Sequence, residues 1–180
     1  MFTIVIDKRE KLPWLFQELK NQSDFRLTAK RNETADYTLE GAENFIAIER
    51  KSFIDFMNTM GLWNDSAGNR KRDRFERELI RMNRDVTNNY VIVETPLAKI
   101  LNARSGWKGR LQKILLLRAI IRIKKRYPKI KWVFCKDRQD AEKTAFYLLA
   151  QAAQIVRKNA KPQFYAPEKP LSISKKVLST

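Results

Sequence analysis

Apolar residues recur along the chain with two different periods, which predict strands and helices respectively. Short apolar or alternating runs are typical of strands, whereas apolar residues three and four positions apart are typical of amphipathic helices. The first pattern predicts strands at residues 2–6, 24–30, 35–40, 45–51, 89–94 and 130–135. The second predicts helices at residues 11–22, 52–60, 74–84, 97–104, 107–127 and 137–158.

The order of these elements predicts an α/β domain. Strands and helices alternate after an initial hairpin, which favours three layers with a mixed central sheet flanked by helices. We expect this domain to span residues 1–158. Residues 61–72 combine Gly, Asn, Asp and Ser without periodicity and predict a mobile loop. Residues 159–180, with three prolines, predict an extended C-terminal tail.

The charge of the chain indicates a polyanionic partner. Lys and Arg number 37 against 20 Asp and Glu, which gives a net charge of +17 and a pI near 10.2. Such an excess favours nucleic acid over a membrane surface. No apolar run is long enough to cross a bilayer, and the N-terminus lacks a signal-peptide pattern. We therefore expect a cytoplasmic protein, associated with the nucleoid if it is bacterial or from a phage.

Missing residue types narrow the possible chemistry. The chain has no histidine and one cysteine, Cys135. This composition excludes Ser-His-Asp triads, Cys-His pairs, histidine bases and zinc sites built from several cysteines. Carboxylates, lysines, arginines and hydroxyls remain. Carboxylates select hard metal ions, so Mg²⁺ or Mn²⁺ is the expected cofactor.

One stretch places an acid and a lysine at the end of a buried strand. Side chains alternate along a strand, so Glu49 and Lys51 should point to one side and Arg50 to the other. A hairpin would bring the preceding strand, with Asp36, next to Glu49. The two carboxylates could then bind a divalent metal, while Lys51 orients the attacking water and stabilises charge on a phosphate. Asp55 follows at the start of the next predicted helix.

The string Asp36-Tyr, Glu49-Arg-Lys51 and Asp55 resembles the GD…ERKxxxD signature of XPF-type structure-specific nuclease domains, within the PD-(D/E)xK nucleases. Ala35 stands where that family has glycine. The resemblance covers roughly residues 2–158 and implies a restriction-endonuclease-like fold. It also implies metal-dependent hydrolysis of DNA, particularly branched or otherwise non-B-form DNA. No helix-hairpin-helix module is visible, so the chain looks like a free-standing nuclease domain, similar to compact versions in phages and mobile elements.

The resemblance also implies roles for individual residues. The catalytic set would be Asp36, Glu49, Arg50, Lys51 and Asp55, and the metal ligands Asp7, Glu10, Asp36 and Glu49. DNA would contact Arg9, Arg70, Lys71, Arg72 and Arg74. Arg50 could pair with Asp55 or with a flanking phosphate. Glu78 departs from the family pattern, which has glutamine there. Glu94 is either a support for the site or a turn-forming acid.

DNA is the expected partner, and a homodimer is a second expectation. Resembled domains pair through their late helices, and the last predicted helix carries a small-and-apolar face made of Ala141, Ala145, Leu148, Ala152 and Ile155. Two other functions stay open at this point. One is a non-catalytic DNA-binding subunit of the same fold, and the other is a basic RNA-binding protein whose acids are structural.

Overall fold

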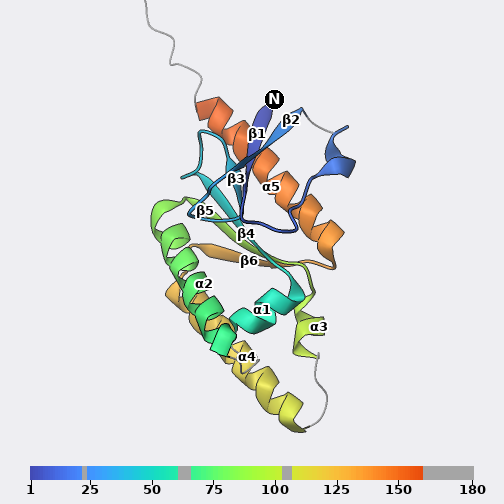
Figure 1. Cartoon of the computed structure of the whole chain (residues 1–180), viewed down its shortest axis with the longest axis vertical. Coiled ribbons are helices and arrows are strands. Elements are labelled where there is room, and N and C mark those ends of the chain that lie inside the picture. The colour runs from blue at the N-terminus through green and yellow to red at the C-terminus, as the bar shows by residue number, and fades with distance from the viewer. Residues whose placement is uncertain (22–23, 61–65, 103–106, 160–180) are drawn as a thin grey trace, which may run out of the picture.

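A six-stranded sheet lies between two layers of helices (Figure 1). The computed structural model describes residues 1–21, 24–60, 66–102 and 107–159, with side chains described outside 66–72 and 107–112. The strands are β1 (Phe2–Asp7), β2 (Phe25–Lys30), β3 (Tyr37–Leu39), β4 (Ile46–Lys51), β5 (Asn88–Val93) and β6 (Ile130–Phe134). The helices are α1 (Phe53–Thr59), α2 (Ser66–Asp85), α3 (Leu97–Leu101), α4 (Trp107–Arg126) and α5 (Arg138–Asn159), with a 3₁₀ turn, η1 (Gln17–Leu19).

The sheet is mixed, in the order β2-β1-β3-β4-β5-β6. β3 pairs antiparallel with β1 and β4, whereas the β1–β2, β4–β5 and β5–β6 pairs are parallel. Gly41 supports the β3–β4 hairpin because its φ of 74° is accessible to glycine at no steric cost. Every residue of β4 is buried, as expected for a strand covered on both faces. The predicted mixed sheet is confirmed.

Two apolar cores separate the sheet from its helices. On one face α5 packs over the sheet, and Phe16, Tyr37 and Phe146 lie in that core. On the other face α1, α2, α3 and α4 cover the sheet, with Phe56 and Leu79 among the buried residues. Figure 1 shows α5 apart from the group formed by α1, α2 and α4. The predicted three-layer α/β architecture is therefore confirmed.

The predicted helix at residues 11–22 is wrong. Among the described residues 11–21, only the short turn η1 forms, and it follows Phe16, whose φ is 53°. The N–H of Trp14 donates to the Tyr37 hydroxyl at 2.6 Å, and the N–H of Phe16 donates to the Glu142 carboxylate. These tertiary partners satisfy backbone donors that a helix would otherwise satisfy. Leu12, one of the apolar residues whose spacing suggested the helix, is 67% exposed.

Residues 66–72 also differ from the prediction of a mobile loop, because they form the first turns of α2. The remainder of that predicted loop, residues 61–65, lies outside the described residues, as do residues 160–180 of the predicted tail. Most of the α5 face that was expected to pair subunits packs on the chain's own sheet. Ala141, Ala145 and Ala152 are buried there and Leu148 is partly buried, whereas Ile155 is 41% exposed. A homodimer stays a prediction, but the buried part of this face cannot form its interface.

No described helix is both long and apolar enough to span a bilayer.

Candidate active site

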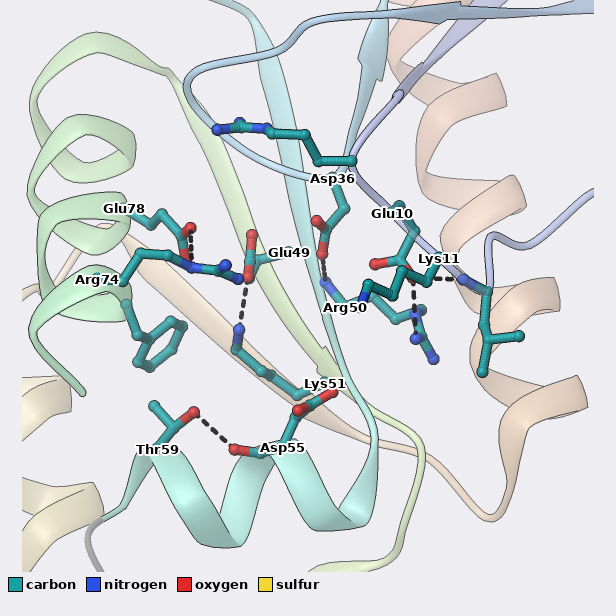
Figure 2. Close-up of a pocket in the computed structure, with 13 residues that line it drawn as sticks. Glu10, Lys11, Asp36, Glu49, Arg50, Lys51, Asp55, Thr59, Arg74 and Glu78 are labelled. Carbon is teal, nitrogen blue, oxygen red and sulfur yellow. Dashed lines mark hydrogen bonds and ion pairs between the residues drawn. The ribbon is translucent and has the colours of Figure 1, made fainter. Parts of the chain in front are cut away.

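A cavity of about 370 Å³ opens beside the C-terminal end of β4 (Figure 2). Its walls come from β4, α1, α2, the segment between β1 and η1, and the residue that precedes β3. The charged residues in the walls include Arg9, Glu10, Asp36, Glu49, Arg50, Lys51, Asp55, Arg74 and Glu78. The structure thus gathers most of the predicted site residues around one hollow.

The alternation predicted along β4 is confirmed. The Lys51 Nζ donates to Glu49 Oε1 at 2.6 Å, and both side chains are almost completely buried. Lys51 also lies over the Phe75 ring, with Nζ 4.4 Å from the ring centroid. Burial alone would lower the pKa of Lys51, but the surrounding carboxylates, Glu49 foremost, hold it above its ordinary value. Lys51 is therefore protonated at neutral pH, and it lies in the wall of the cavity.

Asp36 reaches the same place from the start of β3. The antiparallel register pairs Tyr37 with Ile48, which sets Asp36 beside Glu49. Its Oδ2 accepts a hydrogen bond from the backbone N–H of Arg50 at 2.8 Å. The pKa of Asp36 lies well above its usual value, first because protein atoms desolvate the carboxyl and second because Glu49 repels its negative charge. Asp36 and Glu49 are thus neighbouring acids whose negative charges repel each other.

Glu78 is a third acid of the cavity, supplied by α2. Its Oε1 lies 3.3 Å from Arg74 Nε, whereas its Oε2 is buried without a hydrogen-bond partner among the described residues. Burial, and then repulsion by Glu49, raise the pKa of Glu78 to about 7. The resemblance gave no support for a role here. The useful signal was the Arg74–Glu78 spacing, which puts both side chains on one face of a helix.

Arg50 points away from Glu49 and Lys51, as predicted, but its guanidinium pairs with two other acids rather than with Asp55. Its contact with a flanking phosphate stays a prediction. Its Nη1 donates to Glu94 at 2.8 Å and its Nη2 to Glu10 at 3.2 Å. Asp55 instead belongs to the N-terminus of α1, where Ser52 caps the helix by accepting the Asp55 N–H at 3.2 Å. Arg50 is therefore an internal support, and Asp55 lies in the cavity wall.

Glu94 acts as a support rather than only as a turn residue. Its Oε1 accepts hydrogen bonds from Arg50 Nη1, from Trp14 Nε1 at 2.8 Å and from Arg138 Nη1 at 3.0 Å. These donors come from β4, the segment after β1 and α5. One carboxylate oxygen thus ties three distant parts of the chain together behind the cavity.

Asp7 lies beside Asp36, to whose carbonyl its backbone N–H donates at 2.8 Å, but its carboxylate is directed to Arg9. The Asp7 carboxylate is not part of the cavity wall and accepts hydrogen bonds from the Arg9 backbone N–H and guanidinium. Burial would raise the pKa of Asp7, but these bonds outweigh burial and lower it. Glu10 does reach the cavity, where its Oε1 also accepts from the Leu12 N–H at 2.9 Å. Both acids therefore have cationic or N–H partners already.

Two of the predicted DNA contacts can be placed. Arg74 lines the cavity and is 72% exposed, whereas the Arg9 guanidinium is engaged with Asp7 and the Asn32 carbonyl. Residues 70–72 lie within α2, and their side chains are outside the described part of the chain.

Comparison with known proteins decides the family. The family model of the ERCC4 domain matches residues 6–148. The chain belongs to the ERCC4 domain family. The family is one of DNA nucleases, so the resemblance inferred from the motif is confirmed.

Solved structures agree on the fold of this ERCC4 domain. XPF from Aeropyrum pernix aligns with a TM-score of 0.61 and 19% identity, over 94% of this chain and 69% of that chain. XPF from Aeropyrum pernix in a complex with DNA aligns with a TM-score of 0.56 and 17% identity, over 91% and 69% of the two chains. No curated protein matched the sequence. At these identities the structural likeness establishes the shared fold.

The carboxylate oxygens in the cavity of this ERCC4 domain are the ligand type that hard divalent cations prefer. ERCC4 nucleases generally depend on such a cation. Among the described residues no group of three or more acids or cysteines lies close enough to hold an ion unaided. Mg²⁺ does not need such a cage, because it commonly takes one or two carboxylates together with waters and substrate phosphates. Asp36 and Glu49 are the predicted pair, and a cation beside them would relieve their mutual repulsion.

The raised pKa values predict that the metal-free domain loses stability as the pH rises. Between the ordinary Glu value of 4.5 and about 7, folded Glu78 keeps a proton that the unfolded chain has released. The folded state then binds more protons, so the free energy of unfolding falls with pH, by roughly 1–3 kcal/mol between pH 5 and pH 8. Asp36 acts in the same direction. Urea unfolding in chelator at several pH values measures the slope.

Glu78→Gln is the matched control for this pH dependence, because it removes one of the titrating groups and keeps the shape of the side chain. Its slope between pH 5 and pH 8 should be shallower than that of the unaltered domain. Stability that rises with pH over this window, or a slope unaffected by Glu78→Gln, would contradict the prediction.

Proposed function

We propose that this ERCC4 domain is a metal-dependent endonuclease that hydrolyses DNA phosphodiester bonds, with branched or otherwise non-B-form DNA as the preferred substrate. The observation that carries the proposal is the convergence of Asp36, Glu49 and Lys51 on one cavity of a strongly basic chain. Asp36 and Glu49 would hold Mg²⁺ or Mn²⁺. The bound cation would withdraw charge from the scissile phosphate and lower the pKa of the attacking water.

Lys51 has a separate task that follows from its charge state. Because its pKa is raised, it stays protonated and does not act as the base that takes a proton from water. Its Nζ is held by Glu49 and by the Phe75 ring, so it donates hydrogen bonds from a fixed position. A preorganised donor of this kind stabilises the charge that develops on the phosphate oxygens and orients the attacking water.

Among the described residues, Arg74 is a cation well placed to meet the DNA backbone. It lines the cavity and is mostly exposed, while Lys51 remains buried in the cavity wall. Phosphate contacts position a nucleic acid without reading its bases. DNA as the partner is supported by the family and by the Aeropyrum pernix protein, which was solved in a complex with DNA.

Cleavage assays with chelator test the proposal. Branched and plain duplex DNA, both labelled with a fluorophore, should be cut in Mg²⁺ or Mn²⁺, the branched DNA faster. Excess chelator should abolish cleavage of both, because Asp36 and Glu49 then have no cation to hold.

Three outcomes would contradict it. Cleavage that persists in excess chelator would show that the reaction does not depend on the metal site. Tight DNA binding without cleavage in either metal would make the chain a non-catalytic DNA-binding subunit. Preferential binding of RNA, again without DNA cleavage, would identify an RNA-binding protein whose acids are structural.

A further inference from the structure

The Glu78 carboxylate combines burial with an incomplete set of partners. Only 13% of its side chain is exposed, and Oε2 has no hydrogen-bond partner among the described residues. Its other oxygen faces Arg74, whose side chain is mostly solvated and therefore compensates little of the charge. A buried acceptor without a partner normally costs stability. Its position at a cavity therefore favours a ligand that supplies the missing hydrogen-bond donor.

The charges around Glu78 show what kind of occupant is missing. Glu78 contacts Glu49, and Asp36 lies on the other side of Glu49 in the same cavity (Figure 2). The buried cation facing these three carboxylates is Lys51, which already donates to Glu49 at 2.6 Å. Arg50 is directed to Glu10 and Glu94. When the three carboxylates are ionised, the described part of the cavity has more negative than positive charge, and a bound cation would stabilise that ionised state.

The core packing of α2 holds Glu78 in this position. Phe75, Leu79 and Met82 are buried at helical spacing and fix the helix on the sheet. Glu78 lies between the first two of them and points to the cavity, as Figure 2 shows. Because these core contacts fix α2, the Glu78 carboxylate is held at the cavity before any ligand binds.

We propose that Glu78 helps to hold the divalent cation by accepting a hydrogen bond from the ion's hydration water, beside the direct ligands Asp36 and Glu49. This inference rests on the proposed function. An indirect contact is favoured because the described acids include no trio close enough to share one ion. Mg²⁺ usually keeps several waters, and carboxylates that receive hydrogen bonds from them contribute to affinity.

Metal affinity, rather than activity, tests the role of Glu78. Mn²⁺ binding by the full chain is measured by electron paramagnetic resonance, without DNA. Glu78→Gln should weaken Mn²⁺ binding about 10- to 100-fold, the usual effect of losing such an outer partner. Glu76→Gln is the matched control: it removes the same charge from α2, but Glu76 pairs with Arg126 and Tyr127 outside this cavity. Its Mn²⁺ affinity should be unchanged.

Thermal unfolding provides a second readout, which distinguishes a loss of metal binding from a loss of folding. Without metal at pH 8, Glu78→Gln should be as stable as the unaltered chain or more stable, because a repulsion with Glu49 is removed. Added Mn²⁺ should then raise its melting temperature less than it raises that of the unaltered chain. A metal-free variant of lowered stability would instead indicate a structural role and overturn the inference.

Asp36→Asn separates the failure of this inference from that of the proposed function. If Asp36→Asn loses Mn²⁺ affinity while Glu78→Gln binds as the unaltered chain does, the metal site stands and the role of Glu78 is wrong. If Asp36→Asn also binds Mn²⁺ normally, the metal site itself is wrong, and the inference falls with it.

Discussion

Replacing Lys51 with methionine is expected to slow DNA cleavage by roughly 100- to 1000-fold, the usual effect of removing one preorganised donor from a charge-stabilising site. Methionine keeps an apolar stem against the Phe75 ring but has no cation to place beside Glu49. DNA affinity should fall only slightly, because one charge of a net +17 is lost. The effect should therefore appear in the rate of the chemical step.

Single-turnover cleavage at saturating domain and Mg²⁺ isolates that step. Lys143→Met is a suitable control, since Lys143 carries the same charge on α5, where it approaches Glu18 at 3.7 Å and lies outside the cavity. Its rate should match that of the unaltered domain. Equal rates for Lys51→Met and Lys143→Met would remove Lys51 from the catalytic machinery.

Glu94→Ala should produce the largest loss of stability, about 3–5 kcal/mol, because it breaks a buried ion pair by removing one partner. The Arg50 and Glu94 side chains are only 6% and 9% exposed. Burial alone would lower the pKa of Arg50, but Glu94 and Glu10 hold it above its ordinary value. Arg50 therefore keeps its charge, and the Trp14 indole N–H loses its acceptor as well.

Urea unfolding measures the free energy of unfolding of Glu94→Ala and of the control variant Asp85→Ala. Asp85 also pairs with an arginine, Arg84, but on the surface, where ion pairs contribute little. Asp85→Ala should unfold close to the unaltered domain. A loss in Glu94→Ala no larger than the loss in Asp85→Ala would show that the Arg50 network does not hold the site in place.

Local rules were enough to predict the centre of the site. Alternation along β4 put Glu49 and Lys51 on one side, and the hairpin brought Asp36 to them. Both rules depend on residues close in sequence, and the apolar runs that define the strands are unambiguous. The layers of the fold followed from the same patterns, because each strand and most helices have a clear period.

Contacts between distant residues could not be predicted in the same way. Trp14 and Glu94 are 80 positions apart, and no pattern links them before the chain is folded. In the segment around Phe16, sequence analysis predicted an element that the structure does not contain. The segment has helical spacing, yet Tyr37 and Glu142 take its backbone N–H groups and the chain turns instead. Tertiary hydrogen bonds there outweigh a weak local preference.

Sequence analysis noted Glu78 only as a departure from the family pattern, and the role proposed for it could not be predicted for a related reason. Its importance lies in an unpaired oxygen and in its contact with Glu49, and both depend on how α2 packs across β4. Asp7 shows the converse case. The family resemblance implied that Asp7 and Glu10 bind the metal, but sequence could not show that Arg9 engages the Asp7 carboxylate.

The most direct test of a metal-dependent nuclease site is Asp36→Asn, followed by cleavage and binding on one fluorescent branched DNA. Asparagine keeps a carbonyl oxygen for the Arg50 N–H, so the fold should hold. Cleavage in Mg²⁺ should vanish. Binding in chelator should be unchanged or tighter, and should weaken steeply between two salt concentrations, since phosphate neutralisation by the basic surface provides the affinity. Cleavage by Asp36→Asn at the rate of the unaltered domain would contradict the catalytic assignment, and a folded variant that no longer binds DNA would give Asp36 a structural role instead.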